Sequence, residues 1–496
     1  MKRIYIDYHP KRVKVALVEN GEVVEFYIER SSMPKLVGNI YKGKVVNVLS
    51  SMKAAFVNIG LERNAFLHVG ETLVDPKDIK QSVGTGSLNV SPGDVVMCQV
   101  VKDHFGTKGV RISQNVSIPG RLLVIMPYVN FVGISHKIED EDERKRLEQL
   151  VSSHQPQNIG FIVRTEAAKA SDEEILAEMD KLVSKWKNIL SSFQRAPVCT
   201  TVYEEGDLIF RTIRDFLSDD VDDIFVNNEN VYRDLAEKLQ SLYPNKKLLK
   251  YYPGEDNMFV HYGFQKQIDG LLKRKVVMKN GTYLVIDRTE ALTVIDVNTG
   301  KFVGNTDLEQ TVFETNMVAT AEIAKQLRLR NIGGIVVIDF IDMADEEHRK
   351  AVVEELGRHL AKDRIHTSQP VMTNLGLVEL TRKKTRSMID AVMLRECPYC
   401  HGDGYVFSEE LVILNLRDAL FEHFQKSSAT SVIVHIHPDV FAKVFALRYL
   451  SKECQSAWKG KRIYLIPDST IHAEAFTIKE DNSKILTLPS SAKMLY

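Results

Sequence analysis

Two stretches of alternating apolar residues, 292–298 and 335–342, flank one long helical segment of the chain. Alternation of this kind predicts β-strands. Each stretch carries an aspartate, Asp296 or Asp339, where an apolar residue would be expected. Because successive side chains on a strand point to opposite faces, Asp296 and Asn298 should project from the same face.

The segment between these strands has a predicted start and a predicted stop. Thr306-Asp-Leu-Glu309 matches a capping box, which would open a helix that ends near Arg330. Gly333-Gly334 then turns the chain into the second strand. A strand–helix–strand order lets the two strands lie side by side in one sheet, so we expect Asp296 and Asp339 at neighbouring strand ends.

These polar residues suggest a metal site. An ionised carboxylate inside an apolar strand costs several kcal/mol unless it is paired or bound to a metal. Two aspartates and an asparagine offer the hard oxygen ligands that Mg²⁺ takes while keeping several waters. In the alternative, the aspartates cap turns or pair with arginines. Asp342 is left out of the site because alternation places it opposite Asp339.

The N-terminal part of the chain shows shorter alternating stretches. Residues 3–8, 11–19 and 22–29 are predicted strands, and Asn20-Gly21 is typical of a two-residue hairpin turn. Asp7 lies on the first strand, but no second carboxylate stands nearby in the sequence, which favours a structural role. The next module is rich in short strands and glycines and suits a small closed barrel.

Composition places the chain among ordinary globular proteins. Its 496 residues are enough for three or more domains, 26% are charged, and the net charge is −1. No apolar run approaches about 18 residues and the N-terminus does not match a signal peptide, so neither membrane spanning nor export is indicated. Five cysteines in a chain of this length argue for a reducing, cytoplasmic location.

Cys397-Pro-Tyr-Cys400, followed by glycines, is typical of one knuckle of a zinc site. Tetrahedral zinc needs four ligands, and the chain contains no second Cys-x-x-Cys. The economical solution is that two chains each supply Cys397 and Cys400, so that Zn²⁺ joins a homodimer. A redox dithiol is disfavoured because no thioredoxin-like unit surrounds the pair.

The phrases at residues 289–298, 324–334 and 335–343 resemble the catalytic core of the ribonuclease E/G family, which are single-strand-specific bacterial endoribonucleases. The resemblance covers most of the chain and is strongest to the shorter, ribonuclease G members, since no long disordered scaffold follows. It implies a multidomain α/β and α+β chain with a ribonuclease-H-like domain (1–36 and 209–280), an OB-fold RNA-binding barrel (37–115), a 5′-sensor region (116–208), a DNase-I-like catalytic domain (281–396), a zinc link (397–408) and a small α+β oligomerisation domain (409–496).

The same resemblance implies roles for particular residues. In the barrel, Phe56 and Phe66 would stack on unpaired bases and Lys108 would meet a phosphate; core packing is the alternative for a phenylalanine. The 5′-phosphate sensor would comprise Arg164, Thr165, Gly120 and Val124.

Two residues depart from the family pattern around this sensor. Glu166 puts a negative charge beside the expected phosphate, and His136 replaces a fixed positive charge with a titratable one. Both changes predict a weaker sensor. Elsewhere, the basic run at 382–386 is expected to face RNA phosphates, although such runs are more often solvated surface.

Together these features predict a Mg²⁺-dependent endoribonuclease that cuts single-stranded RNA in rRNA processing and mRNA turnover. Asp296 and Asp339 would hold the metal and Asn298 would assist. The products would carry 5′-phosphate and 3′-hydroxyl ends, and 5′-monophosphorylated substrates would be preferred. Zinc would join two chains, with dimer and tetramer both open. The alternative from another class is a non-catalytic RNA-binding or assembly protein that uses the barrel and the zinc link alone.

Overall fold

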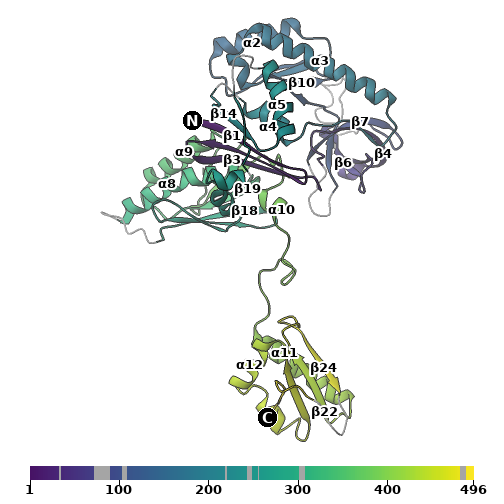
Figure 1. The fold of residues 1–496 in the computed structure, drawn as a ribbon, viewed down its shortest axis with the longest axis vertical. Coiled ribbons are helices and arrows are strands. Elements are labelled where there is room, and N and C mark those ends of the chain that lie inside the picture. The colour runs from purple at the N-terminus through teal and green to yellow at the C-terminus, as the bar shows by residue number, and fades with distance from the viewer. Residues whose placement is uncertain are drawn as a thin grey trace. The chain divides into compact units, whose positions relative to one another are not determined.

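The computed structural model describes residues 1–32, 35–71, 90–102, 109–217, 220–242, 248–254, 256–300, 308–480 and 488–496. The chain is a mixed α/β protein with two compact units, Met1–Met393 and Leu394–Tyr496 (Figure 1). Within the described ranges, no helix is both long enough and apolar enough to cross a membrane.

A five-stranded sheet in the first unit combines strands from distant parts of the sequence. Its order is β15-β14-β1-β2-β3, with β1 antiparallel to β2 and parallel to β14. The strands are β1 (Lys2–His9), β2 (Arg12–Glu19), β3 (Glu22–Arg30), β14 (Asp223–Val226) and β15 (Leu249–Tyr251). Asn20 and Gly21 have φ of 50° and 83°, which confirms the predicted hairpin turn between β2 and β3.

Helices cover both faces of this sheet. Alternate residues of β1 and β2 pack on one face against α4 (Leu208–Phe216) and α5 (Glu229–Leu242). The intervening residues, among them Tyr5 and Ala16, pack on the other face against the short helices α6 (Met258–His261) and α7 (Gln265–Gly270). The sheet is therefore a buried middle layer.

A closed five-stranded barrel follows β3 in the sequence. The strands are β4 (Ile40–Leu49), β5 (Ala54–Asn58), β6 (Ala65–His68), β7 (Val95–Lys102) and β8 (Arg111–Ser113). The barrel closes because β7 pairs with both β8 and β4. At Gly43 a Cβ would lie 2.6 Å from Val57 Cγ1, so glycine permits the close packing. The predicted OB-like barrel is confirmed, and β13 (Thr200–Tyr203) extends its sheet beside β4.

Between the barrel and α4 the chain forms a four-stranded sheet of order β11-β12-β10-β9. Its strands are β9 (Ile118–Pro119), β10 (Leu123–Pro127), β11 (Val132–Ile134) and β12 (Ile159–Val163), and its helices are α2 (Glu141–His154) and α3 (Asp172–Arg195). Ser171 and Glu174 make both hydrogen bonds of a capping box at the start of α3.

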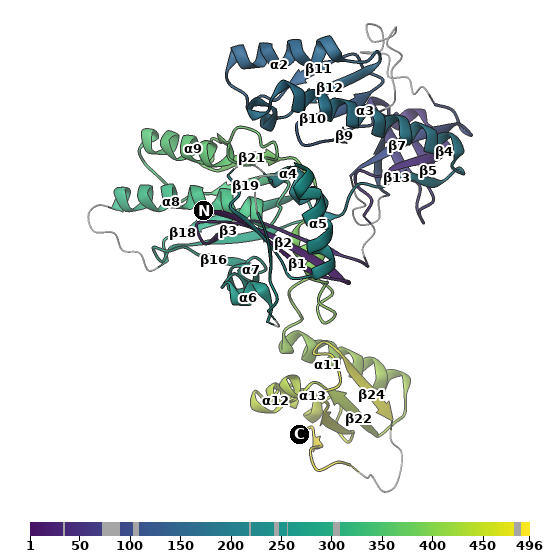
Figure 2. The same cartoon turned by 45° about the horizontal axis from the view of Figure 1, so that its top comes forward.

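A six-stranded sheet of order β16-β17-β18-β19-β21-β20 completes the first unit. Its elements are β16 (Lys275–Val277), β17 (Tyr283–Arg288), β18 (Leu292–Asn298), α8 (Leu308–Leu329), β19 (Gly334–Asp339), α9 (Glu346–Leu360), β20 (Val371–Met372), β21 (Val378–Arg382) and α10 (Ile389–Met393). Figure 2 shows α8 and α9 side by side over one face of the sheet, where their apolar residues share a core with the strands. The predicted capping box at 306–309 falls partly outside the described residues.

The second unit contains a four-stranded sheet of order β24-β22-β23-β25. Its elements are α11 (Glu409–Lys426), β22 (Ser431–Ile436), α12 (Pro438–Ala446), α13 (Ser451–Gln455), β23 (Arg462–Pro467), β24 (Phe476–Glu480) and β25 (Lys493–Met494). Residues of α11 and α12 pack with Trp458 against the apolar positions of β22 and β23. This unit has its own core, and the Cys397–Cys400 segment of the unit precedes the core residues in the chain.

Candidate active site

The strand register of the six-stranded sheet places two aspartates side by side. β18 and β19 run parallel, and Asp296 and Asp339 are direct Cα partners at the ends of the paired region. The parallel direction requires a crossover connection, which α8 provides. The strand–helix–strand pattern of the sequence thus leads to the expected neighbouring positions.

Both aspartates project from the sheet face that α8 and α9 leave uncovered. Their chain neighbours Ile295, Val297 and Ile338 are buried in the core, whereas Asp296 and Asp339 are exposed. The sequence-based expectation that these carboxylates are buried is therefore wrong, because α8 and α9 pack on the other face of the sheet. Their mutual proximity, and not burial, distinguishes them.

Asn298 and Asp342 lie in the same cluster. Asn298 Nδ2 donates a 2.8 Å hydrogen bond to Asp296 Oδ2. Partial burial raises the pKa of the Asp339 carboxyl, and the negative charges of Asp296 and Asp342 raise it further. The alternation argument that placed Asp342 on the opposite face fails, because β19 ends at Asp339 and the chain beyond it is no longer a strand.

This donor set fits a divalent cation of the magnesium type. Within the described ranges, neither Asp296 nor Asp339 forms an ion pair with a lysine, arginine or histidine, so none of the described basic side chains compensates their charge. No group of three or more His, Cys, Asp or Glu residues is placed to hold a metal in the part that the structure describes. Mg²⁺, however, is often held by only one or two carboxylates together with waters and substrate phosphates.

A third strand aspartate, Asp7 on β1, has a different environment. Its carboxylate lies 3.7 Å from Lys14 Nζ and 3.8 Å from Arg12 Nη2. Asn227 Nδ2 donates a 2.7 Å hydrogen bond to the other oxygen. Lys14 is buried and its ammonium lies 5.3 Å from the centroid of the Phe259 ring. Cationic side chains therefore compensate this carboxylate, as expected for a structural residue.

The barrel aromatics lie outside the barrel core. Phe56 on β5 and Phe66 on β6 are Cα partners, and their ring centroids are 6.0 Å apart in an edge arrangement. Both side chains are half-buried, whereas the alternate residues Ala55, Val57 and Leu67 fill the interior. The outward rings offer faces on which unpaired bases can stack.

Strand pairing adds a basic residue that sequence reasoning missed. Arg111 on β8 is the Cα partner of Phe66 and pairs with Glu71 at 3.2 Å. Lys108, the basic residue predicted from the sequence, lies outside the described residues. Arg111 is distant from Phe66 in the chain, so only the β6–β8 pairing places it beside the aromatic pair.

Arg164 and Thr165 follow β12 and line a cavity with a volume of about 930 Å³. Arg164 Nη1 donates a 2.6 Å hydrogen bond to the Gly120 carbonyl, and Nη2 pairs with Asp215 at 3.0 Å. The Thr165 hydroxyl lies 3.1 Å from the Ser135 hydroxyl. Neighbouring groups thus hold the side chains of both predicted sensor residues in place.

Gly120 and Val124 support this region without lining the cavity. A Cβ on Gly120 would lie 2.4 Å from Glu178 Oε1, which accepts backbone hydrogen bonds from Leu122 and Leu123. Val124 on β10 pairs with Ile162, which does line the cavity. Their contribution is therefore to the packing behind Arg164.

The cavity contains charged residues from several segments, most of which sequence reasoning missed. The basic and imidazole side chains are Arg121, His136, Lys137, Arg144, Arg164, Arg214, Arg364 and His366, and the carboxylates are Glu148, Glu166, Asp215 and Asp363. Residues 357–370, which follow α9 or form its end, provide one wall. The two departures from the family pattern, His136 and Glu166, both line the cavity.

The prediction that the basic run at 382–386 faces RNA is wrong for Arg382. Its guanidinium pairs with Asp363 at 2.7 Å, and both side chains are almost completely buried. Lys383 and Lys384 are exposed, while the Arg386 guanidinium lies 4.4 Å from the centroid of the Tyr27 ring. A run of charges in the sequence does not show which members become buried.

Cys397 and Cys400 form a knuckle in the second unit. All five cysteines of the chain are free thiols. Backbone N–H groups of Cys400 and Tyr399 bond to the Cys397 sulfur and lower the pKa of its thiol, and Gly404 N lies 3.3 Å from Cys400 Sγ. Such N–H groups favour thiolates, the form that binds zinc. Two cysteines from one chain would supply half of the ligands of a tetrahedral site.

Comparisons with known proteins agree with this geometry. A model of the ribonuclease E/G family matches residues 117–385. Ribonuclease G of Haemophilus influenzae is 40% identical over 438 residues, which cover 87% of this chain and 89% of that protein. The chain belongs to the ribonuclease E/G family. Ribonuclease G of Escherichia coli K12 is 39% identical over 444 residues, and the match covers 91% of that protein.

The larger members of the ribonuclease E/G family match over a smaller share of their length. Ribonuclease E of Synechocystis is 36% identical over 401 residues, which cover 80% of this chain but 59% of that protein. The resemblance to the shorter members, drawn from the catalytic phrases, is confirmed. Membership of this family of ribonucleases also confirms the prediction of an endoribonuclease.

Proposed function

We propose that this endoribonuclease cleaves single-stranded RNA in a Mg²⁺-dependent reaction that leaves 5′-phosphate and 3′-hydroxyl ends. It acts in RNA processing and decay, including rRNA maturation and mRNA turnover, in the cytoplasm. The observation that carries the proposal is the direct pairing of Asp296 with Asp339 on an exposed sheet face, without a cationic partner among the described residues.

Asp296 and Asp339 would hold the metal, and Asn298 fixes the Asp296 carboxylate through its 2.8 Å hydrogen bond. When bound, Mg²⁺ lowers the pKa of a coordinated water and stabilises charge on the scissile phosphate. The raised pKa of Asp339 reflects repulsion from Asp296 and Asp342 in addition to burial, and a cation would relieve this repulsion. The open sheet face gives a flexible strand access to the carboxylates.

The barrel would bind the strand and the cavity would bind its end. Bases stack on the outward rings of Phe56 and Phe66, each stack contributing about 1–3 kcal/mol, and Lys108 meets a phosphate. Arg164 and Thr165 offer a guanidinium and a hydroxyl to a 5′-monophosphate, with Gly120 and Val124 as support. Glu166 opposes this binding by charge, so Glu166→Gln should increase the preference for a 5′-monophosphate over a 5′-hydroxyl.

The described sheets support an assignment of domains. Residues 1–36 and 209–280 would form a discontinuous ribonuclease-H-like domain, because β1–β3 share a sheet with β14 and β15. Residues 37–115 form the barrel, 116–208 the sensor region and 281–396 a DNase-I-like catalytic domain. Residues 397–408 would link this domain to the small α+β domain at 409–496.

Zinc would join two chains through Cys397 and Cys400 of each. Free thiols with directed backbone N–H groups support this proposal, because one knuckle supplies half of a four-ligand site. Metal analysis should give one zinc per two chains, and Cys400→Ser should shift the mass in solution from dimer to monomer. One zinc per chain, or a dimer unchanged by the substitution, would contradict the proposal.

The test of the reaction uses a fluorescent single-stranded oligonucleotide with a 5′-monophosphate. Cleavage should require Mg²⁺, stop on addition of EDTA, and yield a downstream fragment that a 5′-phosphate-dependent exonuclease can degrade. RNA binding should persist in EDTA. Binding without cleavage under any divalent metal would instead favour the non-catalytic RNA-binding protein, and fragments with 5′-hydroxyl ends would contradict the proposed cleavage to 5′-phosphate and 3′-hydroxyl ends.

A further inference from the structure

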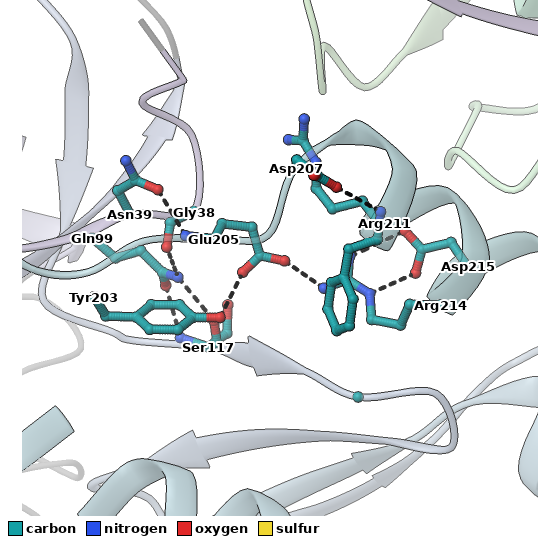
Figure 3. Close-up of polar contacts among 12 residues, drawn as sticks. Gly38, Asn39, Gln99, Ser117, Tyr203, Glu205, Asp207, Arg211, Arg214 and Asp215 are labelled. Atoms are coloured by element: carbon teal, nitrogen blue, oxygen red, sulfur yellow. Dashed lines mark hydrogen bonds and ion pairs between the residues drawn. The ribbon is translucent and has the colours of Figure 1, made fainter. Parts of the chain in front are cut away.

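A series of buried polar contacts connects the base of the barrel with helix α4. Figure 3 shows Glu205 between Asn39, which precedes β4, and Arg214 on α4. Glu205 N donates a 2.8 Å hydrogen bond to Asn39 Oδ1, and the Glu205 carboxylate pairs with Arg214 Nη1. The Glu205 and Arg214 side chains are only 7% and 11% exposed, so water screens this pair weakly.

The barrel end of this series is fixed by its own hydrogen bonds. Gln99 on β7 donates 2.9 Å bonds to the carbonyls of Gly38 and Ser117 and accepts a 2.8 Å bond from Ser117 N (Figure 3). Tyr203 donates its hydroxyl to the second Glu205 oxygen at 3.3 Å. Glu205 is therefore anchored to the barrel through its backbone and held by donors at both carboxylate oxygens.

The other end of the series reaches the sensor. Arg214 binds both oxygens of Asp215 at 3.1 Å, and Asp215 Oδ1 also pairs with Arg164 Nη2 at 3.0 Å. Burial alone would raise the pKa of the Asp215 carboxyl, but Arg214 and Arg164 outweigh burial and hold that pKa below its usual value. Asp215 is thus a carboxylate anion fixed by one arginine and presented to another.

We propose that Asp215 is the positioning residue that aims Arg164 into the end-binding cavity, with Arg214 and Glu205 fixing Asp215 to the barrel. This inference rests on the proposed binding of a 5′-monophosphate. Arg164 uses one N–H for Asp215 and one for the Gly120 carbonyl, and its remaining donors can meet a phosphate. A guanidinium fixed in advance loses less conformational entropy when it binds.

The arrangement couples two RNA contacts mechanically. Because Glu205 is bonded to Asn39 of the barrel and through Arg214 to Asp215, the strand-binding surface and the end-binding cavity share one polar framework. Loosening this framework should weaken recognition of the phosphate end more than binding of the strand. The relevant quantity is therefore the ratio of affinities for two ends of the same RNA.

The test measures binding by the full chain in EDTA, so that cleavage does not interfere. Two 3′-labelled single-stranded oligonucleotides differ only in a 5′-monophosphate or a 5′-hydroxyl, and anisotropy gives the ratio of their Kd values. Asp215→Asn should lower the wild-type preference for the phosphate by about tenfold, because the amide offers one acceptor oxygen to two arginines. Arg164→Gln removes the guanidinium itself and should therefore give the smallest preference for the 5′-monophosphate.

The matched control is Glu29→Gln. Glu29 pairs with Arg211, another arginine of α4, and the side chains of this pair are 19% and 14% exposed, close to the 20% of Asp215. Neither residue lines the cavity. Glu29→Gln should therefore keep the wild-type preference even where its thermal unfolding temperature falls as much as that of Asp215→Asn. An equal loss of preference in both variants would reduce the effect to general destabilisation and overturn the inference.

Glu205→Gln tests the framework from the barrel side. Glu205→Gln alone should reduce the preference for the 5′-monophosphate partly. Combined with Asp215→Asn, it should cause little further loss of preference, because both substitutions act through the same contacts. Additive losses would overturn the coupling. A wild-type chain without any end preference would overturn the proposed end-sensing together with this inference, whereas undiminished or increased preference in Asp215→Asn would overturn this inference alone.

Discussion

Two sheets of the first unit carry strand aspartates, and their surroundings differ in charge. Asp7 in the five-stranded sheet is largely buried, faces Lys14 and Arg12, and accepts a hydrogen bond from Asn227. Asp296 and Asp339 in the six-stranded sheet face each other on an exposed surface. A carboxylate that the chain neutralises serves packing, whereas carboxylates that repel each other leave a place for an external cation.

The largest expected effect comes from substituting either of the two aspartates proposed to bind the metal. Asp339→Asn or Asp296→Asn should lower kcat/KM for a single-stranded RNA by about 1,000-fold, since a bound metal supplies several kcal/mol of charge stabilisation. Asp7→Asn is the control and should cleave at the wild-type rate below its unfolding temperature. Equal loss in all three variants would remove the distinction between the sheets.

In the metal-free protein, substitutions at the two sites should change the stability of the fold in opposite directions. Because the folded-state pKa of Asp339 is raised, its ionised form disfavours folding at pH values above that pKa. Asp339→Asn should therefore melt at the same or a higher temperature in EDTA at pH 7. Asp7→Ala should lose about 3 kcal/mol, because the buried ammonium of Lys14 loses its partner. Chemical unfolding with both variants measures the difference.

Substituting Asn298 should have a smaller effect, and only on the rate of cleavage. Asn298→Ala removes the hydrogen bond to the Asp296 carboxylate, a charge-assisted contact of about 1.5–3 kcal/mol. If that contact orients the metal ligand, cleavage should slow by about tenfold to a hundredfold. Raising the Mg²⁺ concentration should recover part of the rate. Unchanged cleavage would restrict the site to the two aspartates.

The smallest effect concerns a neutralised but exposed carboxylate. Lys279 and Lys325 hold the pKa of Glu22 at about 2 by hydrogen bonds and charge. Its folded-state pKa is depressed, so its contribution to stability is present above about pH 4.3 and is lost as the pH falls towards about 2. Because Glu22 is 44% exposed, Glu22→Gln should cost less than about 1 kcal/mol at pH 7. A larger loss would mean that exposure does not weaken the pair.

Local patterns in the sequence determined much of this protein. Alternation predicted the strands that carry Asp296 and Asp339, Asn20-Gly21 predicted the hairpin turn, and the catalytic phrases identified the family. These features depend on interactions within a few residues or on long contiguous phrases, which a single sequence contains.

Tertiary structure alone decided exposure and charge environment. It placed the aspartates on an open sheet face instead of inside an apolar layer, brought Asp342 near Asp339 after the strand ended, and buried Arg382 against Asp363. It also joined Asp215 to Arg164, two residues from different segments. The physical reason is that burial and electrostatic fields depend on which distant segments pack together, and the spacing of residues along the chain does not contain that information.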